Sequence, residues 1–221
     1  MVDVFASPGS AKKNSKCKNK GRNCVIITAW ILKMKTFSDD EIIQSVIEGR
    51  TQNFEILVER YKRKIVNFIN KMIYDYDEAQ NIAQDVFLKV YETLKKYKRG
   101  NNFSAFIFTI AKNLTLNYIK KSKRTVLFST FFSKQAGEKH FSYEAQQEEK
   151  YLESQDEERL VTALKELKEN QRLALILKVY LNFSYNKIAD VTGWSIPKIE
   201  TLISRAKSNL KNKIFLQEKG A

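Results

Sequence analysis

The 221-residue sequence has little of what interrupts a helix or holds a metal: two prolines, seven glycines, two cysteines and one histidine. Because proline and glycine disfavour helix interiors, their scarcity among segments rich in Leu, Ile, Lys and Glu predicts an all-α protein. Cys17, Cys24 and His140 cannot be assembled into a set of metal ligands. We therefore expect reduced thiols, no metal and no cofactor.

Motifs for catalysis are also missing. The sequence has no glycine-rich phosphate loop, no Ser/His/Asp or Cys/His arrangement, and no acid cluster matched to a metal. The paired acids Asp39/Asp40 and Asp77/Glu78 lie at the starts of expected helices, where carboxylates favour the helix dipole. We interpret both pairs as helix caps and expect a binding protein rather than an enzyme.

The apolar segment Cys24–Leu32 is too short to cross a membrane. It has nine residues, whereas a transmembrane helix needs about 20. No Ala-x-Ala cleavage site follows it, so a signal peptide is a poor alternative. We interpret Met34 as a natural start and residues 1–33 as a disordered basic extension. No membrane insertion and a cytoplasmic location are expected.

The net charge of +14 and the pI of about 9.6 favour a polyanionic partner, most simply nucleic acid. The charge is uneven, because residues 1–36 carry eight Lys or Arg against one acid. Residues 37–124 carry sixteen against eleven. Half of the excess therefore lies in a tail, and total charge alone is a weak argument.

Apolar periodicity predicts two small helical domains joined by a flexible linker. The first, residues 34–124, contains helices from Ser38 to Gly49 and over about 51–72, 77–94 and 103–123. In the last of these we expect an inner stripe of Phe106, Ile107, Ile110, Ala111 and Leu114. Residues 125–155 lose the periodicity and are interpreted as the linker, although the apolar Val126–Phe132 is unusual for an exposed segment. Helices over about 156–168 and 171–181 begin the second domain, residues 156–221.

The stretch from Phe183 to Leu210 is typical of a helix-turn-helix. Ser184 and Ser195 are placed to cap two helices, and Gly193 lies between them, where a tight turn needs positive φ. Pro197 falls in the first turn of the second helix, where its missing N–H costs nothing. An inward stripe is formed by Ile199, Leu202, Ile203, Ala206 and Leu210, and the outward residues are Lys198, Thr201, Ser204, Arg205 and Ser208. Such an outward face suits the major groove of DNA.

In their order and spacing these segments resemble bacterial sigma factors of the extracytoplasmic-function group. The match covers about 38–213. The polymerase-gripping helix of that family is matched by Ala79, Ile82, Gln84, Asp85, Val86 and Phe87, with Gln80 and Asn81 in place of two acids. The promoter-melting helix is matched by Phe103, Ile107, Ile110, Ala111 and Asn113; Phe106 replaces a Trp, Asn117 an Asp and Lys120 an Arg. The second domain is matched by Leu160, Ala163, Leu164, Leu167, Arg172, Arg205 and Ala206, with Lys198 and Glu200 in place of Thr and Lys.

The resemblance implies a transcription initiation factor that binds RNA polymerase core and promoter DNA, both duplex and melted, with an anti-sigma factor as a candidate partner. Polymerase contacts would be Gln80, Asn81, Gln84, Asp85 and Phe87. Contacts to the minus-ten element would be Tyr97, Phe103, Phe106, Lys112, Asn113, Asn117, Lys120, Lys121, Lys123 and Arg124. Contacts to the minus-thirty-five element would be Lys198, Glu200, Thr201, Ser204, Arg205 and Lys207, with Lys211 on the DNA backbone.

Several of these residues have a structural alternative. Tyr97 would stack on a flipped base that Asn113 hydrogen-bonds; alternatively, Tyr97 closes a helix end and Asn113 bonds a neighbour. Phe87 and Phe106 are also candidates for the core. At the level of the whole chain, the alternatives are an autonomous helix-turn-helix regulator, a serine recombinase and a purely structural module. The recombinase lacks support because Ser45 and Ser104 have no clustered arginines beside them.

Overall fold

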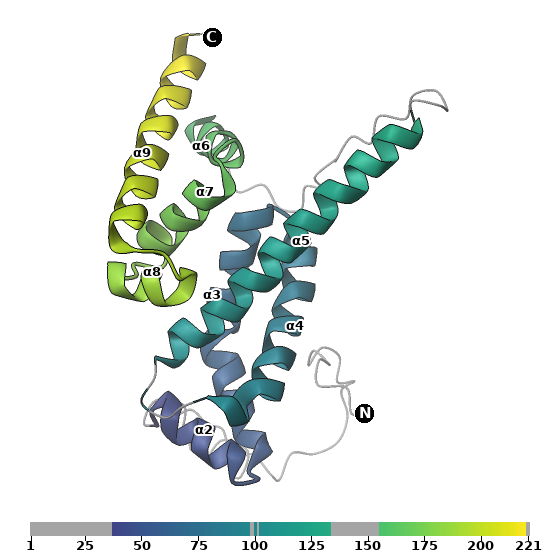
Figure 1. The fold of residues 1–221 in the computed structure, drawn as a ribbon, viewed down its shortest axis with the longest axis vertical. Helices are drawn as coiled ribbons and strands as arrows, with labels where there is room; N and C mark the ends of the chain where they lie inside the picture. The colour runs from purple at the N-terminus through teal and green to yellow at the C-terminus, as the bar shows by residue number, and fades with distance from the viewer. Residues whose placement is uncertain (1–36, 98–99, 101, 134–154, 220–221) are drawn as a thin grey trace, which may run out of the picture. The chain divides into compact units, whose positions relative to one another are not determined.

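The computed structural model describes residues 37–97, 100, 102–133 and 155–219, and all regular structure in these ranges is helical (Figure 1). The chain divides into Met1–Ser38 and Asp39–Ala221, and every helix below belongs to the second unit. The expectations for residues 1–33, for Cys17, Cys24 and His140, and for the linker residues 134–154 lie outside the described residues. The all-α prediction is confirmed.

The first group of helices comprises α2 (Asp39–Ile47), α3 (Phe54–Ile73), α4 (Tyr76–Thr93) and α5 (Phe103–Ser133), with 3-10 turns at Thr51–Asn53 and Leu94–Lys96. Gly49 follows α2 with φ of 102°, and Tyr74 ends α3 in the left-handed region with φ of 59°. Asp75 caps α4 by accepting a hydrogen bond from the Glu78 N–H at 2.9 Å. The cap is thus Asp75, and the expected pair Asp77/Glu78 lies in the first turn, where it still favours the helix dipole.

The core of this group lies among α3, α4 and α5. Its largest fully buried side chains include Ile56, Leu57, Ile65, Phe68, Ile69, Met72, Ile107 and Phe108. The rings of Phe68 and Phe108 meet edge to face with centroids 5.5 Å apart, a favourable geometry for aromatic pairs.

The inner stripe expected for α5 is only partly right. Ile107 and Ala111 are fully buried, but Phe106, Ile110 and Leu114 are half-buried, and Phe108 is buried instead. The reason is that α5 packs against α3 and α4 on one side and against α8 (Tyr185–Thr192) on another. Phe108 meets Phe183, just before α8, with ring centroids 5.1 Å apart. A helix covered on two sides does not show a single apolar stripe.

Helix α5 also continues to Ser133, into the segment that the sequence predicted as linker. No glycine or proline occurs between Phe103 and Ser133, so nothing in the local sequence breaks the hydrogen-bond ladder. The apolar stretch noted at 126–132 therefore lies in a helix.

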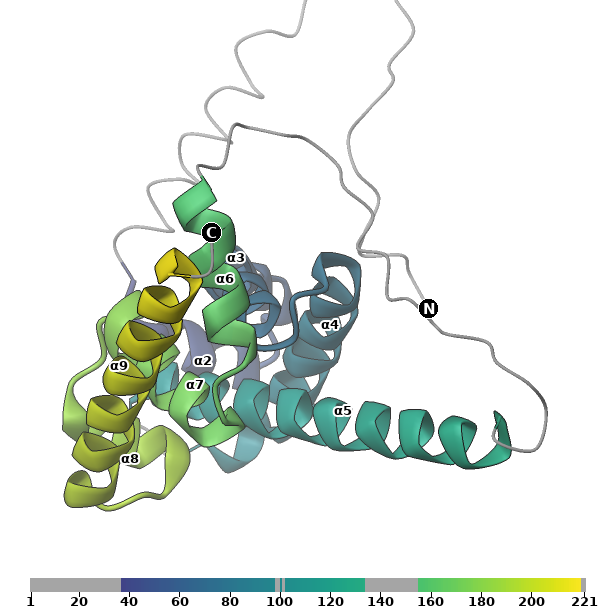
Figure 2. The ribbon, with the colours of Figure 1, turned by 90° about the horizontal axis from the view of Figure 1, so that it is seen from above.

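The second group comprises α6 (Gln155–Lys165), α7 (Glu169–Leu175), a π-helical turn (Ile176–Tyr180), α8 and α9 (Ile196–Lys219). Figure 2 shows α6 and α7 lying along α9. Leu167, Leu175 and Ala206 form the centre of a small core, with Leu164 and Leu210 packed against it.

The predicted helix-turn-helix is present. The Ser184 hydroxyl accepts from the Lys187 N–H at 3.2 Å, and Gly193 takes a φ of 73° between the two helices. The carbonyl of Ser195 accepts the first hydrogen bond of α9, from the Ile199 N–H at 3.1 Å. Ile199, Ile203 and Ala206 are buried, as expected, and the opposite face of α9 is exposed.

Candidate protein and nucleic-acid interfaces

One face of α4 is exposed and mainly polar. It carries Gln80, Asn81, Gln84 and Asp85, all of which the sequence predicted as polymerase contacts. Leu88 lies one turn beyond Gln84 and is 64% exposed. An apolar side chain within a polar face is typical of the centre of a protein-binding surface. We call Asn81, Gln84, Asp85 and Leu88 the α4 face.

Phe87 was predicted on this face, but it is 6% exposed and belongs to the core. Its position on the buried stripe with Ala83 and Val90 explains this. Leu88 was not predicted, because apolar residues are normally read as core residues. Leu88 lies outside the helical stripe of buried residues in α4, and this position could have indicated that it is exposed.

An acid from α2, Asp40, binds both Tyr97 and Gly100, which lie between α4 and α5. The Tyr97 hydroxyl donates to Oδ1 of Asp40 at 2.9 Å, and the Gly100 N–H donates to Oδ2 of the same carboxylate at 2.9 Å. The Tyr97 ring lies against Phe103 and Phe106, with centroids 5.7 and 5.5 Å away. Burial, then the hydrogen bond and charge of Asp40, raise the pKa of Tyr97.

Two predicted DNA contacts are therefore interior residues in this structure. Tyr97 is 9% exposed and Phe103 is 3% exposed, so neither ring offers a free face for stacking. Tyr97 closes the end of the preceding helical segment, which was the alternative given for it. Phe106 is half-buried and lies at the edge of the same aromatic cluster.

The neighbouring acid, Asp39, binds α3. Asp39 accepts hydrogen bonds from the Arg60 guanidinium and, at 2.5 Å, from the Tyr61 hydroxyl. The Tyr61 ring in turn meets Phe103 edge to face, with centroids 5.4 Å apart. Asp39 and Asp40 thus lie in the first turn of α2, as predicted, and in addition bind two different neighbouring elements.

The exposed side of α5 carries a polar and basic row. It runs from half-buried Phe106 through the exposed residues Asn113, Asn117, Lys120, Lys121 and Arg124. These positions recur every three, four or seven residues and so share one side of the helix. Lys112 lies beside the row, half-buried, and loss of solvation lowers its pKa. Lys123 is exposed and pairs with Glu169 of α7. We call Phe106, Asn113, Asn117, Lys120, Lys121 and Arg124 the α5 row.

The exposed side of α9 carries the second set of predicted DNA contacts. Its exposed members are Lys198, Glu200, Thr201, Ser204, Arg205, Lys207 and Lys211. Lys198 Nζ lies 5.1 Å from the centroid of the Trp194 ring, a cation–π contact that restrains a long side chain. The Thr201 hydroxyl donates to the Pro197 carbonyl at 2.8 Å, and this bond within α9 restrains the orientation of the Thr201 side chain.

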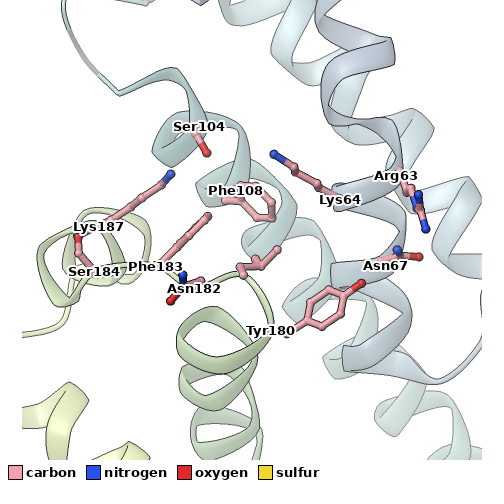
Figure 3. A pocket seen from close by; sticks show the side chains of 11 residues that line it. Arg63, Lys64, Asn67, Ser104, Phe108, Tyr180, Asn182, Phe183, Ser184 and Lys187 are labelled. Atoms are coloured by element: carbon pink, nitrogen blue, oxygen red, sulfur yellow. The ribbon is translucent and has the colours of Figure 1, made fainter.

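A hollow that the sequence did not predict lies beside Phe108 (Figure 3). It has a volume of about 610 Å³, and its lining includes the cations Arg63, Lys64 and Lys187. Loss of solvation, then repulsion by Lys64, lowers the pKa of Lys187. These cations come from α3 and α8, which are far apart in the sequence, and no local pattern brings them together.

Residues 57–125 match the family model of Sigma-70 region 2, and residues 157–210 match that of Sigma-70 region 4. The RNA polymerase sigma factor YlaC of Bacillus subtilis (strain 168) is 29% identical over 160 residues, covering 72% of this chain and 90% of that protein. The RNA polymerase sigma-H factor of Pseudomonas aeruginosa is 27% identical over 173 residues, covering 76% and 90%. The ECF RNA polymerase sigma-E factor of Escherichia coli (strain K12) is 25% identical over 182 residues, covering 80% and 94%.

Solved structures share the fold. The sigma factor RpoE of Bartonella quintana, in complex with the anti-sigma factor NepR, superposes with a TM-score of 0.61 at 24% identity, covering 74% of this chain and 97% of that one. CnrH, in complex with the cytosolic domain of CnrY, superposes with a TM-score of 0.59 at 17% identity, covering 83% and 99%.

The helical architecture, the helix-turn-helix and the two matched regions define a bacterial transcription initiation factor. The chain belongs to the sigma-70 family of RNA polymerase sigma factors and is of the extracytoplasmic-function type. It directs RNA polymerase to promoters and is not itself an enzyme. The membership decides against the autonomous regulator, the recombinase and the structural module. Within the described ranges, no helix has the length and apolar character needed to span a bilayer.

Proposed function

We propose that three surfaces divide the work of initiation. The α4 face binds polymerase core, the α5 row contacts the melted strand of the minus-ten element, and the exposed side of α9 reads the minus-thirty-five element as duplex. The observation that carries this division is the α5 row, where amides adjoin cations along one side of a single helix. Amides can read the polar edge of a base, and cations neutralise phosphates.

The α4 face supports the polymerase contact through its composition. Gln84 and Asp85 are exposed and offer hydrogen-bonding groups, and Leu88 offers apolar area that docking would bury. Asn81 is oriented by a hydrogen bond from its amide to the Glu78 carboxylate at 3.2 Å. A face of this kind is suited to a partner helix with complementary polar groups around an apolar pocket.

In the α5 row, Asn113 is the candidate for reading an unpaired base, and Phe106 is the candidate for stacking beside it. Phe106 replaces Tyr97 and Phe103 in this role because it is the ring of the aromatic cluster that stays half-exposed. Lys120, Lys121 and Arg124 would hold the phosphate backbone further along α5, where extra cations add affinity that salt weakens.

In α9, Arg205 is the candidate for a bidentate contact to guanine, and Lys198, Thr201 and Ser204 flank it on the exposed side. Glu200 is suited to accept from a cytosine amine. Lys207 and Lys211 are backbone candidates. A cytoplasmic location and regulation by an anti-sigma factor are part of the proposal. This chain shares the fold of RpoE, which was solved with the anti-sigma factor NepR.

The test is transcription by reconstituted holoenzyme. Purified protein and polymerase core are used for run-off transcription on genomic fragments, which identifies a promoter. Core affinity, duplex capture and strand opening are then measured on it for variants of each surface. The proposal requires three different defects. Identical defects from α4, α5 and α9 variants would contradict the division.

A further inference from the structure

Both carboxylate oxygens of Asp40 are used on the connection between α4 and α5. Oδ1 accepts from the Tyr97 hydroxyl and Oδ2 accepts from the Gly100 N–H, each at 2.9 Å. These partners lie 57 and 60 residues away in the sequence. A first-turn acid needs neither bond to favour a helix dipole. Asp40 therefore has a second role, in holding Tyr97 and Gly100.

The connection leads directly into the α5 row. The Asn102 side chain accepts from the Ala105 N–H at 3.1 Å and so starts α5. Tyr97, held by Asp40, packs its ring against Phe106 with centroids 5.5 Å apart. Phe106 is the first member of the row. The position of the ring proposed to stack on an unpaired base thus depends on the bond between Asp40 and Tyr97.

Gly100 adds a backbone requirement. Its φ of 85° is a conformation that L side chains rarely adopt, although a Cβ at this position would meet nothing within 4 Å. The N–H that donates to Asp40 therefore depends on a backbone conformation suited to glycine. The positive φ favours glycine here, since there is room for a Cβ. The carboxylate and the glycine act on the same hydrogen bond.

We propose that Asp40 is a positioning residue for recognition of the melted minus-ten strand. It holds Tyr97 and Gly100, and through them Phe106, in the geometry that receives an unpaired base. The proposal rests on the function proposed for the α5 row and adds to it a residue from α2 that does not touch DNA. Preorganisation of this kind raises affinity by reducing the ordering needed when the strand binds.

Asp39 provides the matched control. It is the adjacent acid in the same first turn, half-buried like Asp40, but its hydrogen bonds go to Arg60 and Tyr61 in α3. Asp39→Asn and Asp40→Asn remove the same charge from the same helix end. They differ in whether the lost partner is α3 or the connection before α5.

The experiment uses holoenzyme on a promoter identified by run-off transcription. Binding of a single-stranded minus-ten oligonucleotide and of a scrambled strand is measured by fluorescence anisotropy below the unfolding temperature of every variant. Asp40→Asn and Gly100→Ala should each lower the ratio of the two affinities by about fivefold to tenfold, the size expected for loss of one typical net hydrogen bond. Asp39→Asn should lower the melting temperature while leaving that ratio within about twofold of wild type.

Tyr97→Phe removes the hydroxyl and keeps the ring, so it should reproduce part of the Asp40→Asn effect. Adding Tyr97→Phe to Asp40→Asn should then have little further effect, because both act on one bond. An unchanged affinity ratio in Asp40→Asn, or an equal loss of ratio in Asp39→Asn, would overturn the proposal. Asn113→Ala distinguishes failure of the positioning role from failure of the function proposed for the α5 row. If Asn113→Ala also leaves strand binding unchanged, the function proposed for the α5 row is wrong. If it lowers strand binding while Asp40→Asn does not, only the positioning role of Asp40 is wrong.

Discussion

The Asn209 side-chain amide on α9 donates to Oε1 of Gln171 on α7 at 3.1 Å, and Gln171 is 7% exposed. This bond joins α9, the second helix of the helix-turn-helix, to α7, which packs against it. Asn209 lies four residues after Arg205, one helical turn away. The pair therefore helps to set the rotation of α9 and, with it, the direction of its exposed side.

Asn209→Ala should lower the free energy of unfolding by about 1–2 kcal/mol, because it leaves a buried acceptor on Gln171 without this donor. Ser208→Ala is the control, since Ser208 is exposed and its removal should change stability by less than about 0.5 kcal/mol. Urea unfolding of the full chain, followed by circular dichroism, measures both. Equal stability of the two variants would show that the pair contributes nothing.

Leu88→Ala should weaken binding to polymerase core by about 1–2 kcal/mol, because docking would bury a side chain that is now 64% exposed. Gln84→Ala combined with Asp85→Ala should also lower core affinity while leaving helicity intact. Val179→Ala is the matched control: Val179 is also 64% exposed, but it lies outside α4. Affinity is measured by titrating labelled protein with core. A loss in Val179→Ala equal to that in Leu88→Ala would argue against the α4 face.

Asn113→Ala should slow strand opening while leaving initial capture of the duplex nearly normal, because its contact forms only after a base has left the stack. Permanganate footprinting reports opening, and gel shifts of the holoenzyme on closed promoter DNA report capture. A template already opened across the minus-ten element should rescue the variant in part if melting is its main contribution.

Arg205→Ala should fail at the earlier step. Loss of a bidentate contact to guanine costs about 1–3 kcal/mol of duplex binding. Because that contact lies in the minus-thirty-five duplex, a template pre-opened across the minus-ten element should not rescue it. Gel shifts on closed and pre-opened templates separate the cases. The same defect at the same step in Arg205→Ala and Asn113→Ala would contradict two separate readers.

Two tyrosines should ionise late. Burial and a neighbouring carboxylate, Asp39 for Tyr61 and Asp40 for Tyr97, raise the pKa of each phenol above its ordinary value of 10.0. Below that value the phenols are protonated in both the folded and unfolded chain, so their contribution to stability is complete. Above it the unfolded chain ionises first, and stability falls as the pH rises through the raised pKa.

An ultraviolet titration of the phenolates checks this. Tyr61→Phe and Tyr97→Phe should each remove one phenol from the high-pH part of the titration curve. When the chain unfolds at high pH, the buried phenols become exposed and should then ionise at their ordinary pKa. If each variant instead loses a phenol that ionises at the ordinary pKa, then Tyr61 and Tyr97 are not bound to Asp39 and Asp40 as the structure has them.

Periodicity predicted α4 and α9 well because each of these helices buries one face. All members of the stripe expected for the α4 region, Ile82 to Leu94, are buried. In α9, Ile199, Ile203 and Ala206 are buried as expected, and Leu202 and Leu210 are half-buried. Helix α5 was harder, since Phe108 packs against Phe68 on one side and Phe183 on the other. Its extension to Ser133 was missed because loss of an apolar period was taken as loss of helix.

The site residues show the same limit. Exposed polar positions such as Gln84 and Arg205 follow from the helical period and were placed on the correct faces. Asp40 was interpreted only as a helix cap, because nothing near it in the sequence indicates a partner 57 residues away. Tyr97 was expected to meet DNA, but in the structure it bonds Asp40 and its ring is buried against Phe103 and Phe106.

Because α5 is continuous, it also fixes the distance between residues at its two ends. At about 1.5 Å of rise per residue, Phe106 and Arg124 are held roughly 27 Å apart along one helix. On the function proposed for the α5 row, a matching promoter would place its unpaired bases and the adjoining phosphates at a fixed interval. The length of α5 would then set this interval, and its exposed side chains would set the sequence preference.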